Sequence, residues 1–364
     1  MPLHVDYLKH TLDFRFEAGT SRGVLRQHDA YFLRVTDDER PGQVGLGEAS
    51  PLPGLSIDFA DFEANLQKVC NLFNKLDLEV FSWNFTLLIE QLVDKRFPAL
   101  RFGLETALLD LLNGGRRVVF DNEFSRGNRR LPINGLVWMG DRDAMARQVD
   151  EKLQAGFTTL KLKVGAIDFD QECALLANIR ARFSPDQITL RVDANGAWTP
   201  DDAAHRLREL ARFDLHSIEQ PIRPRQTEAL AELCRTSPVP VALDEELIGL
   251  NDYMEKFKLL KAVNPPFLIL KPTLLGGFQG CREWIEIANR LKIRWWLTSA
   301  LESNVGLNAI SQFAAEFQNP LPQGLGTGQL YRNNVPAPLH VEAGHLSYQP
   351  EAHWALQPVL NGLA

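Results

Sequence analysis

The stretch ITLRVDANGAWTPDDAAHRLRELARFDLHSIEQP, residues 188–221, has the pattern of a strand, a helix and a second strand. Its two ends, ITLRVDAN and LHSIEQP, are short apolar runs that finish in polar residues, and the segment between them has helical periodicity. Thr199 and Pro200 precede the helical segment, where threonine can cap a helix and proline suits its first turn. The stretch is therefore predicted to form one β-α-β unit of a parallel sheet.

The same alternation extends along the chain in both directions from this stretch. Strand-like runs occur in eight places: LPINGLVW from Leu131, TLKLKV from Thr159, ITLRVDAN from Ile188, LHSIEQP from Leu215, VPVALDEE from Val239, FLILKPT from Phe267, IRWWLTSA from Ile293 and PQGLGTG from Pro322. Seven segments with helical periodicity lie between these runs. The pattern predicts an α/β protein with a modified TIM barrel, (β/α)7β, over residues 131–330.

The first 130 residues lack this alternation and predict an α+β capping domain at the N-terminus. Strands are expected near 12–17 and 31–35, and helices near 59–74 and 102–113. The glycine- and proline-rich stretch 42–56 is interpreted as a mobile loop that closes over a site, with an ordinary surface connection as the alternative. The proline-containing residues 331–364 are expected to pack back on the capping domain.

The composition is that of an ordinary globular protein, with 45% hydrophobic and 23% charged residues among 364. A formal net charge of -7 gives no basic field, so nucleic acid is not an expected partner. The four cysteines form no CxxC pair, which argues against a disulfide framework or a thiolate zinc site. Without a secretory signal or a long apolar span, the sequence predicts a cytoplasmic protein that does not contact membranes.

Charged and amide side chains stand at the carboxyl ends of successive predicted strands, which is the face that carries catalytic groups in TIM barrels. In chain order these residues are Lys161, Lys163, Asp193, Asn195, Glu219, Asp244, Glu245 and Lys271. Because side chains alternate along a strand, Lys161 and Lys163 face the same way, as do Asp193 and Asn195. The sequence therefore predicts one cluster of acids and amines at a single mouth of the barrel.

The acids Asp193, Glu219 and Asp244 are candidate ligands of a metal ion. One carboxylate at a strand end is more often a salt bridge or a helix cap, but three successive strands end alike here. An all-oxygen site suits a hard divalent cation whose coordination is completed by water and substrate. Mg²⁺ is the expected cofactor, with Mn²⁺ as the alternative.

The lysines of the cluster are candidate catalytic groups. Most lysines are solvated surface charges, but Lys161 and Lys163 lie within the apolar run TLKLKV and Lys271 within FLILKPT, which favours inward placement. Crowding and poor solvation are expected to lower the pKa values of these amines, so that one can act as a base. A base beside a metal that holds a carboxylate can remove the proton next to that carboxylate.

The motifs KLKVG, VDANGAW, IEQPI, ALDEEL and ILKPTLLGG occur in this order. Together they resemble the enolase superfamily, in its muconate-lactonizing subgroup, over the whole barrel and the segment before it. The resemblance implies that Lys163 is the base, that Lys271 lies on the other side of the substrate, and that Lys161 tunes Lys163 and contacts the carboxylate. The mandelate racemase subgroup is disfavoured, because IRWWLTSA contains no histidine.

Within this subgroup, LKPTLLGG and GLGTGQLY are similar to the members that dehydrate 2-succinyl-6-hydroxy-2,4-cyclohexadiene-1-carboxylate to 2-succinylbenzoate in menaquinone biosynthesis. That resemblance implies a syn loss of water, in which Lys163 takes the proton and then protonates the departing hydroxyl. Lys271 would stabilise the developing charge and the aromatic ring. The small-molecule carboxylate substrate is expected to contact Asn195, Ser299, Ser303, Gly326 and Thr327, the last four at its succinyl group.

Alternative interpretations remain open at this point. An N-succinylamino acid racemase would use the same metal and both lysines, and a noncatalytic barrel would only bind a carboxylated metabolite or a protein. A dipeptide epimerase is disfavoured, because the DxD motif that holds the substrate's ammonium is replaced by GLGTG at 324–328. GLGTG also lacks the context of a dinucleotide site. The pair Trp295 and Trp296 is interpreted as barrel packing, and the oligomeric state is not predicted.

Overall fold

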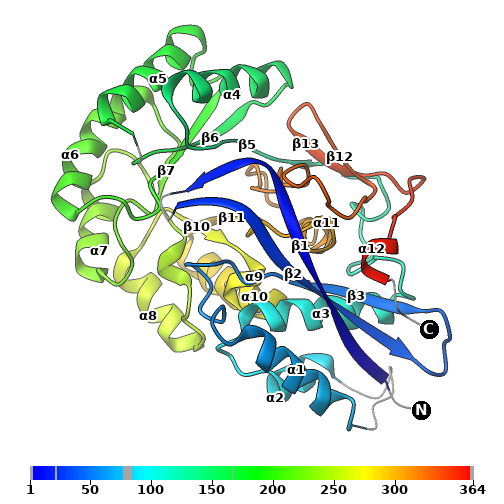
Figure 1. Cartoon of the computed structure of the whole chain (residues 1–364). Helices are drawn as coiled ribbons and strands as arrows, with labels where there is room; N and C mark the ends of the chain where they lie inside the picture. Colours follow the sequence, from blue (N-terminus) through cyan, green and yellow to red (C-terminus); the bar gives the residue numbers. More distant parts are fainter. Residues whose placement is uncertain (1–2, 21–22, 77–83, 166, 361–364) are drawn as a thin grey trace.

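The computed structural model describes residues 3–20, 23–76, 84–165 and 167–360 (Figure 1). Its largest sheet is parallel, in the order β11-β10-β9-β8-β7-β6-β5. These strands are β5 Gly135–Val137, β6 Thr159–Lys163, β7 Thr189–Asp193, β8 Ser217–Glu219, β9 Val241–Leu243, β10 Phe267–Leu270 and β11 Arg294–Leu297. The order follows the chain without a crossover, which is the arrangement of a TIM-type barrel.

Helices alternate with these strands and cover the outside of the sheet (Figure 1). They are α4 Arg142–Gln154, α5 Phe169–Arg182, α6 Pro200–Leu210, α7 Thr227–Thr236, α8 Tyr253–Val263, α10 Gly277–Leu291 and α11 Asn304–Ala315, with the short α9, Pro272–Leu275, before α10. As predicted, Thr199 caps α6, because its side chain accepts a hydrogen bond from Asp202 N at 3.2 Å. The prediction of a (β/α)7β barrel is confirmed.

The eighth predicted strand, PQGLGTG, is reduced to two residues that close the barrel. Gln323 forms a parallel bridge with Ile133, before β5, and Gly324 forms one with Thr298, after β11. The two edge strands are thereby joined through this short segment. A side chain at position 324 would overlap Thr298, so the close approach requires glycine.

In the described part of the N-terminal segment, an antiparallel sheet and three helices precede the barrel. The sheet has the order β1-β2-β3, with β1 Leu3–Thr20, β2 Gly23–Asp37 and β3 Val44–Ala49, and the helices are α1 Phe62–Phe73, α2 Phe85–Leu92 and α3 Pro98–Leu112. This mixture of strands and helices agrees with the predicted α+β segment, although α2 was not predicted. The proposed boundaries near residues 130 and 330 stay a prediction.

The interpretation of stretch 42–56 as a loop is wrong for its first half. Residues 44–49 form β3, whose backbone lies directly against α3, and a side chain at Gly47 would overlap the carbonyl of Gly103. Glycines that usually mark loops here permit close packing between a strand and a helix. Only the turn that follows β3 reaches the mouth of the barrel, where Leu52 and Leu55 line a pocket.

Two buried acids connect this N-terminal layer to helices of the barrel. Glu48 in β3 accepts hydrogen bonds from Ser303 N at 2.7 Å and Gly306 N at 2.8 Å, at the start of α11. Glu105 in α3 accepts one from Gln279 N at 3.3 Å, at the start of α10, and burial raises its pKa to about 7. Carboxylates are favoured at helix N-termini, so these contacts attach the N-terminal layer to the starts of α10 and α11.

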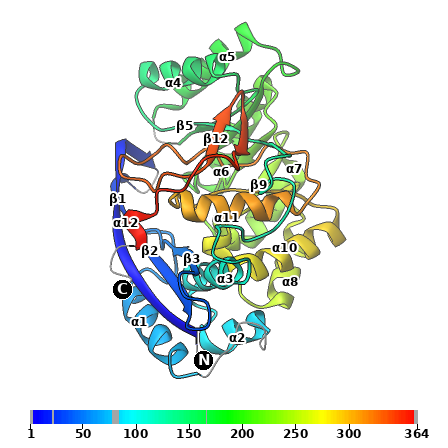
Figure 2. The same ribbon diagram turned by 90° about the vertical axis from the view of Figure 1, so that its right-hand side faces the viewer.

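The C-terminal residues contact the N-terminal sheet. Strand β12, Leu339–Glu342, pairs with β13, His345–Tyr348, and β13 pairs in turn with β4, Leu131–Pro132. The short α12 spans Gln357–Leu360. Tyr331 packs on Phe14 with ring centroids 4.7 Å apart, and Asn333 Oδ1 accepts a hydrogen bond from Asp13 N at 2.7 Å. Figure 2 shows α12 beside β1, and Val359 shares a core cluster with Phe14.

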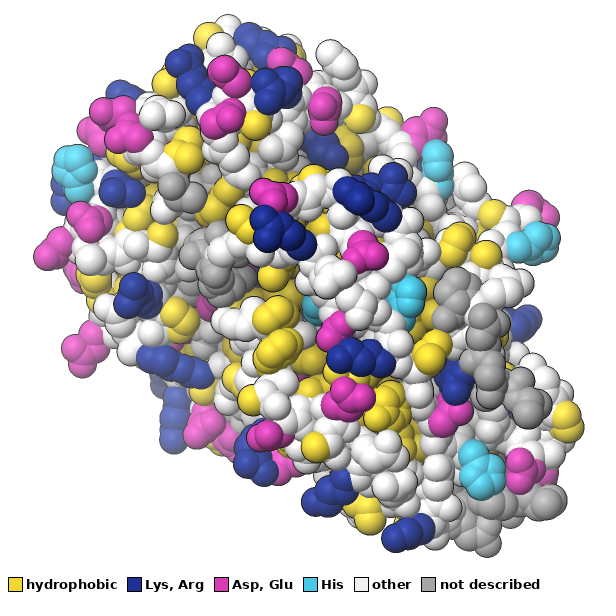
Figure 3. Space-filling view, viewed as in Figure 1, with side chains coloured by type: hydrophobic (Ala, Val, Ile, Leu, Met, Phe, Trp, Pro, Cys, Tyr) yellow, Lys and Arg dark blue, Asp and Glu magenta, His cyan; other side chains and the backbone are white. Residues whose placement is uncertain are grey.

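The surface carries charges of both signs. On the face seen in Figure 3, lysine and arginine side chains are interspersed with aspartate and glutamate rather than gathered in one patch. Within the described ranges, no helix combines the length and the apolar character that crossing a bilayer requires.

One buried histidine in the N-terminal sheet predicts acid sensitivity. His28 is 2% exposed, neither of its ring nitrogens has a hydrogen-bond partner among the described residues, and burial lowers its pKa to about 4. The unfolded chain therefore takes up this proton first as the pH falls below about 6.5, and folding stability is lost from there toward pH 4.

The variant His28→Leu is expected to remove this part of the acid sensitivity. For wild type, linkage predicts a loss of about 2 kcal/mol from this residue between pH 7.5 and pH 5. Urea unfolding at both pH values, for wild type, His28→Leu and the exposed control His205→Gln, measures the difference directly. Equal acid sensitivity in wild type and His28→Leu would contradict the assignment.

Candidate active site

The predicted acids and lysines meet inside one mouth of the barrel. Lys163 lies beside Asp193 in the register of β6 and β7, and Asp193 lies beside Glu219 in that of β7 and β8. The Nζ of Lys161 is 2.8 Å from Asp193 Oδ2 and 2.5 Å from Glu219 Oε2. Lys271, directly after β10, pairs with Asp244, directly after β9. These side chains therefore converge at the carboxyl ends of the strands, as the sequence predicts.

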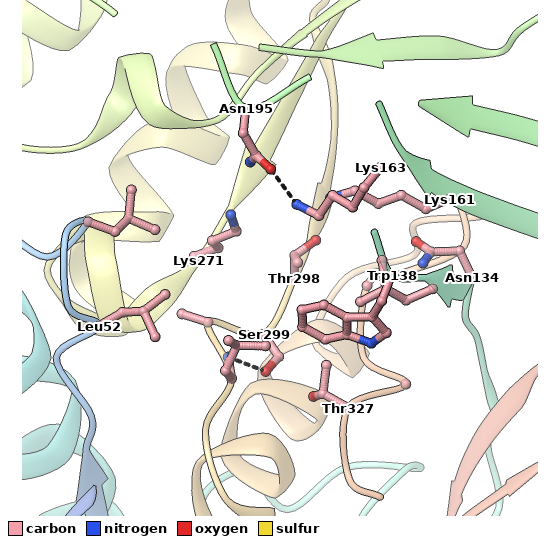
Figure 4. A pocket seen from close by; sticks show the side chains of 16 residues that line it. Leu52, Asn134, Trp138, Lys161, Lys163, Asn195, Lys271, Thr298, Ser299 and Thr327 are labelled. Carbon is pink, nitrogen blue, oxygen red and sulfur yellow. Dashed lines mark hydrogen bonds between the residues drawn. The ribbon is translucent and has the colours of Figure 1, made fainter. Parts of the chain in front are cut away.

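Lys163 is held by two side chains that follow β7. Its Nζ donates to Asp193 Oδ2 at 2.6 Å. It also donates to Asn195 Oδ1 at 2.8 Å (Figure 4). The amide of Asn195 donates in turn to Glu245 Oε1 at 2.9 Å. Both ends of the Asn195 amide are thus engaged with protein groups. These contacts favour a role in orienting Lys163 over the predicted contact with substrate, which stays a prediction.

The expectation of lowered lysine pKa values is wrong for Lys161 and Lys271. Burial opposes the charge of Lys161, but Asp193 and Glu219 outweigh it and raise its pKa. Burial likewise opposes the charge of Lys271, and Asp244 and Glu219 outweigh it and raise its pKa. The sequence shows the lysines as a group, but the structure places acids between them, and opposite charges favour the ammonium form.

Glu219 lies at the centre of the acidic group. Burial and the neighbouring Asp193 raise the pKa of Glu219 well above its usual range. Burial also disfavours the charge of Asp193, but Lys161 and Lys163 outweigh it and hold its pKa well below the usual range. Among the described residues, Glu219 Oε1 has no hydrogen-bond partner although it is buried. A buried oxygen without a donor, beside a second acid, is a place where a cation is favoured.

The acidic side chains of the site have the ligand chemistry that a hard divalent cation prefers, but their positions are not yet those of a coordination shell. In the part of the chain that the structure describes, no three acidic, histidine or cysteine side chains already surround a common point as ligands would. Lys161 and Lys271 hold the carboxylates instead. The three acids nevertheless supply only oxygen ligands, as Mg²⁺ and Mn²⁺ prefer.

A pocket that is partly open to solvent lies directly in front of the lysines, with about 740 Å³ of empty space when the open solvent at its mouth is included. Figure 4 shows Lys163 and Lys271 entering it from different strands, near Asn195. Apolar side chains form much of the remaining wall: Leu52, Leu55, Leu136, Trp138, Ala300 and Leu301. Ammonium groups on one side and apolar walls on the other suit a small carboxylate with a hydrocarbon body.

Four of the five predicted substrate-binding residues line this pocket, namely Asn195, Ser299, Gly326 and Thr327. Ser303 does not. Its hydroxyl donates to Glu48 and accepts from Val305 N at 3.1 Å, so that it caps α11 and fixes the N-terminal layer. These contacts give Ser303 a structural role.

Several lining residues were not predicted. Asn134, Leu136 and Trp138 alternate in the run LPINGLVW, so its period of two could have identified the residues that face inward. No sequence pattern identifies Leu52 and Leu55 as lining residues, because they belong to the N-terminal layer and reach the pocket only through its packing on the barrel. The pair of tryptophans is buried, with Trp295 7% and Trp296 1% exposed, and the prediction of barrel packing is confirmed.

A parallel barrel with acids and lysines at the carboxyl ends of its strands, beneath an α+β layer, defines a class of enzyme. This chain belongs to the enolase superfamily: the family described as "Enolase C-terminal domain-like" matches residues 144–352. The o-succinylbenzoate synthase of Desulfotalea psychrophila is 46% identical in sequence, over 94% of this chain and 98% of the relative.

Solved structures agree with this assignment. MenC from Desulfotalea psychrophila LSv54 superposes with a TM-score of 0.85 and 44% identity, over 95% of this chain and 100% of that chain. The muconate lactonizing enzyme from Pseudomonas fluorescens gives a TM-score of 0.80 at 22% identity, over 95% of this chain and 94% of that chain. The second likeness supports the fold alone.

Proposed function

We propose that this chain catalyses the reaction of the o-succinylbenzoate synthases. Water is lost from 2-succinyl-6-hydroxy-2,4-cyclohexadiene-1-carboxylate, and 2-succinylbenzoate forms. The observation that carries the proposal is the pair Lys163 and Lys271, which enter one pocket beside buried acids in a chain 46% identical to such an enzyme. We also propose a cytoplasmic location, as the sequence predicts.

Asp193, Glu219 and Asp244 are the proposed ligands of Mg²⁺, with Mn²⁺ as the alternative. A bound divalent cation would withdraw charge from the substrate carboxylate and so acidify the adjacent carbon. Ionisation of Glu219, which burial and Asp193 oppose, would be favoured in its presence. The three carboxylates would then exchange part of their contact with Lys161 and Lys271 for contact with the cation.

Lys163 is the proposed base. As a neutral amine it takes the proton from the carbon next to the carboxylate, and the C–H electron pair forms the new ring double bond. The C–O bond of the hydroxyl breaks, Lys163 returns the proton to the departing oxygen, and water leaves as the ring becomes aromatic. Asp193 and Asn195 fix the position of Nζ for both transfers, at 2.6 and 2.8 Å.

Lys271 is the proposed electrostatic partner. Burial opposes its charge, but Asp244 and Glu219 raise its pKa, so it stays an ammonium group at neutral pH. A fixed positive charge beside the pocket stabilises the negative charge that develops on the substrate. It also attracts the face of the aromatic product.

Chelation is expected to stop dehydration. Purified protein in excess EDTA should lose more than about 99% of its rate of 2-succinylbenzoate formation, and added Mg²⁺ should restore it, because the carboxylate charge is then stabilised again. Exchange of the α-proton of an N-succinylamino acid in deuterated water, measured in parallel, tests the racemase alternative. Rapid exchange without dehydration would overturn the proposed function, and full activity in EDTA would remove the metal from it.

A further inference from the structure

Gln220, the glutamine of the motif IEQPI, lies directly after the proposed metal ligand Glu219 at the end of β8. Its side chain is fully buried and does not line the pocket, so it takes no direct part in binding a substrate there. Its φ of 38° lies in the left-handed region, which residues other than glycine, asparagine and aspartate rarely adopt. A backbone conformation of this kind at a functional site points to a role for the contacts that hold it.

The side chain of Gln220 joins the loop after β8 to the loop after β9. Its Oε1 accepts hydrogen bonds from Asp244 N at 3.2 Å and from Glu246 N at 3.1 Å. Its Nε2 donates to Ile222 O at 3.0 Å, which fixes the orientation of the amide. One neutral amide thereby links the segments that carry Glu219 and Asp244.

The backbone of Gln220 extends this link to the third acid. Gln220 N donates to Ala242 O in β9 at 2.9 Å, and Gly196 N, in the loop after β7, donates to Gln220 O at 2.6 Å. Asp193 is the last residue of β7 and precedes that loop. The loops after β7, β8 and β9, at which the proposed ligands stand, therefore all meet at Gln220.

The bonds to Gln220 also leave the carboxylate of Asp244 available to a cation. Asp244 occupies the N-cap position of the 3₁₀ turn Glu245–Leu247, where an aspartate side chain usually accepts a hydrogen bond from an N–H group of the turn. Its side chain makes no such bond, and Gln220 accepts from Glu246 N in its place. The Asp244 carboxylate faces Lys271 in the site instead. Loss of the Gln220 amide would leave Glu246 N free to compete for this carboxylate.

We propose that Gln220 is a positioning residue that fixes the spacing of the Glu219 and Asp244 carboxylates and so sets the affinity for the divalent cation. The proposal rests on the proposed metal site and adds the residue that preorganises it. Groups that orient metal ligands without touching the metal contribute about ten- to a hundredfold to metal affinity. Glutamine suits this place because its amide accepts from two N–H groups, donates to a carbonyl and adds no charge beside the acids.

Gln220→Met removes the amide and keeps a side chain of similar length. The variant is expected to bind Mn²⁺ about ten- to a hundredfold more weakly than wild type, as measured by electron paramagnetic resonance of free Mn²⁺. The Mg²⁺ concentration that gives half-maximal dehydration should rise by a similar factor, whereas the maximal rate should fall much less. Gln220→Gly removes the same side-chain bonds and tolerates the positive φ, so it provides a second variant for the same measurements.

Gln312→Met is the matched control. Gln312, in α11, is also fully buried, and its Nε2 donates to Arg117 O at 2.9 Å. Its Oε1 accepts from Val119 N at 2.7 Å and from Phe120 N at 3.0 Å. These partners lie outside the loops that carry the proposed ligands. Gln312→Met should therefore lower the melting temperature in EDTA, as loss of buried hydrogen bonds does, but leave the Mn²⁺ affinity unchanged.

The outcomes separate the positioning role from the metal site itself. Wild-type Mn²⁺ affinity in both Gln220→Met and Gln220→Gly would overturn the inference and leave the proposed function intact. An equal loss of affinity in Gln312→Met would also overturn it, since the effect would then follow from any buried glutamine. Absence of Mn²⁺ binding in wild type would instead overturn the proposed metal site and the inference with it.

Discussion

Lys163→Ala is expected to lower the rate constant for dehydration at least about a thousandfold, within the range that general base catalysis contributes. In this variant no amine lies between Asp193 and Asn195, where Nζ now approaches both within 2.8 Å. Lys271 cannot replace it, because its pKa is raised by Asp244 and it enters from a different strand. The measurement is single-turnover formation of 2-succinylbenzoate in saturating Mg²⁺.

A loss of rate in Lys163→Ala is informative only if binding and fold persist. The melting temperature should change little, because Lys163 lies at the end of β6 with its head group in the pocket. The Kd for 2-succinylbenzoate should rise no more than about tenfold, the equivalent of 1.4 kcal/mol. Lys258→Ala, which removes an exposed lysine on α8, is the matched control and should retain full activity. A Lys163→Ala rate within tenfold of wild type would remove this residue as the base.

Glu219→Gln is expected to weaken the binding of Mn²⁺ at least about a hundredfold. Loss of a residue that only hydrogen-bonds to a metal ligand already lowers metal affinity by up to about a hundredfold, and loss of a ligand itself should lower it at least as much. The rise in melting temperature that Mg²⁺ causes in wild type should disappear in the variant. Electron paramagnetic resonance of free Mn²⁺ measures the affinity without any use of catalytic activity.

Without metal, Glu219→Gln is expected not to lower the melting temperature. Burial and Asp193 raise the pKa of Glu219, so its ionised form is disfavoured in the metal-free protein. A neutral glutamine relieves that repulsion, and in EDTA the variant should unfold at the same temperature as wild type or higher. Glu232→Gln, an exposed acid on α7, serves as the control and should change neither measurement. Unchanged Mn²⁺ affinity in Glu219→Gln would exclude Glu219 as a ligand.

Much of the fold could be predicted because its signals are local. The β-α-β periodicity from Leu131 onward gave the barrel, and the cap at Thr199 and Pro200 marked the start of α6. The predictions of local structure are wrong where glycine can either mark a loop or permit close packing. In the stretch 42–56 the glycines predict a loop, whereas in the structure Gly47 permits the close contact of β3 with α3. In PQGLGTG, which is predicted to be the eighth strand, Gly324 permits a bridge with Thr298, but a full strand does not form.

The sequence by itself determined which side chains share a mouth of the barrel, because alternation along each strand and the common direction of parallel strands follow from local chemistry. Only the tertiary structure decided what those side chains do to one another. Acids between Lys161 and Lys271 raise lysine pKa values that proximity of amines alone would lower. The hydroxyl of Ser303 is bound to Glu48, 255 residues away, whereas those of Thr298 and Thr327 have no partner within the described part of the chain. A hydrogen bond or an ion pair depends on distances of a few ångströms between segments remote in the chain, and periodicity carries no information about them.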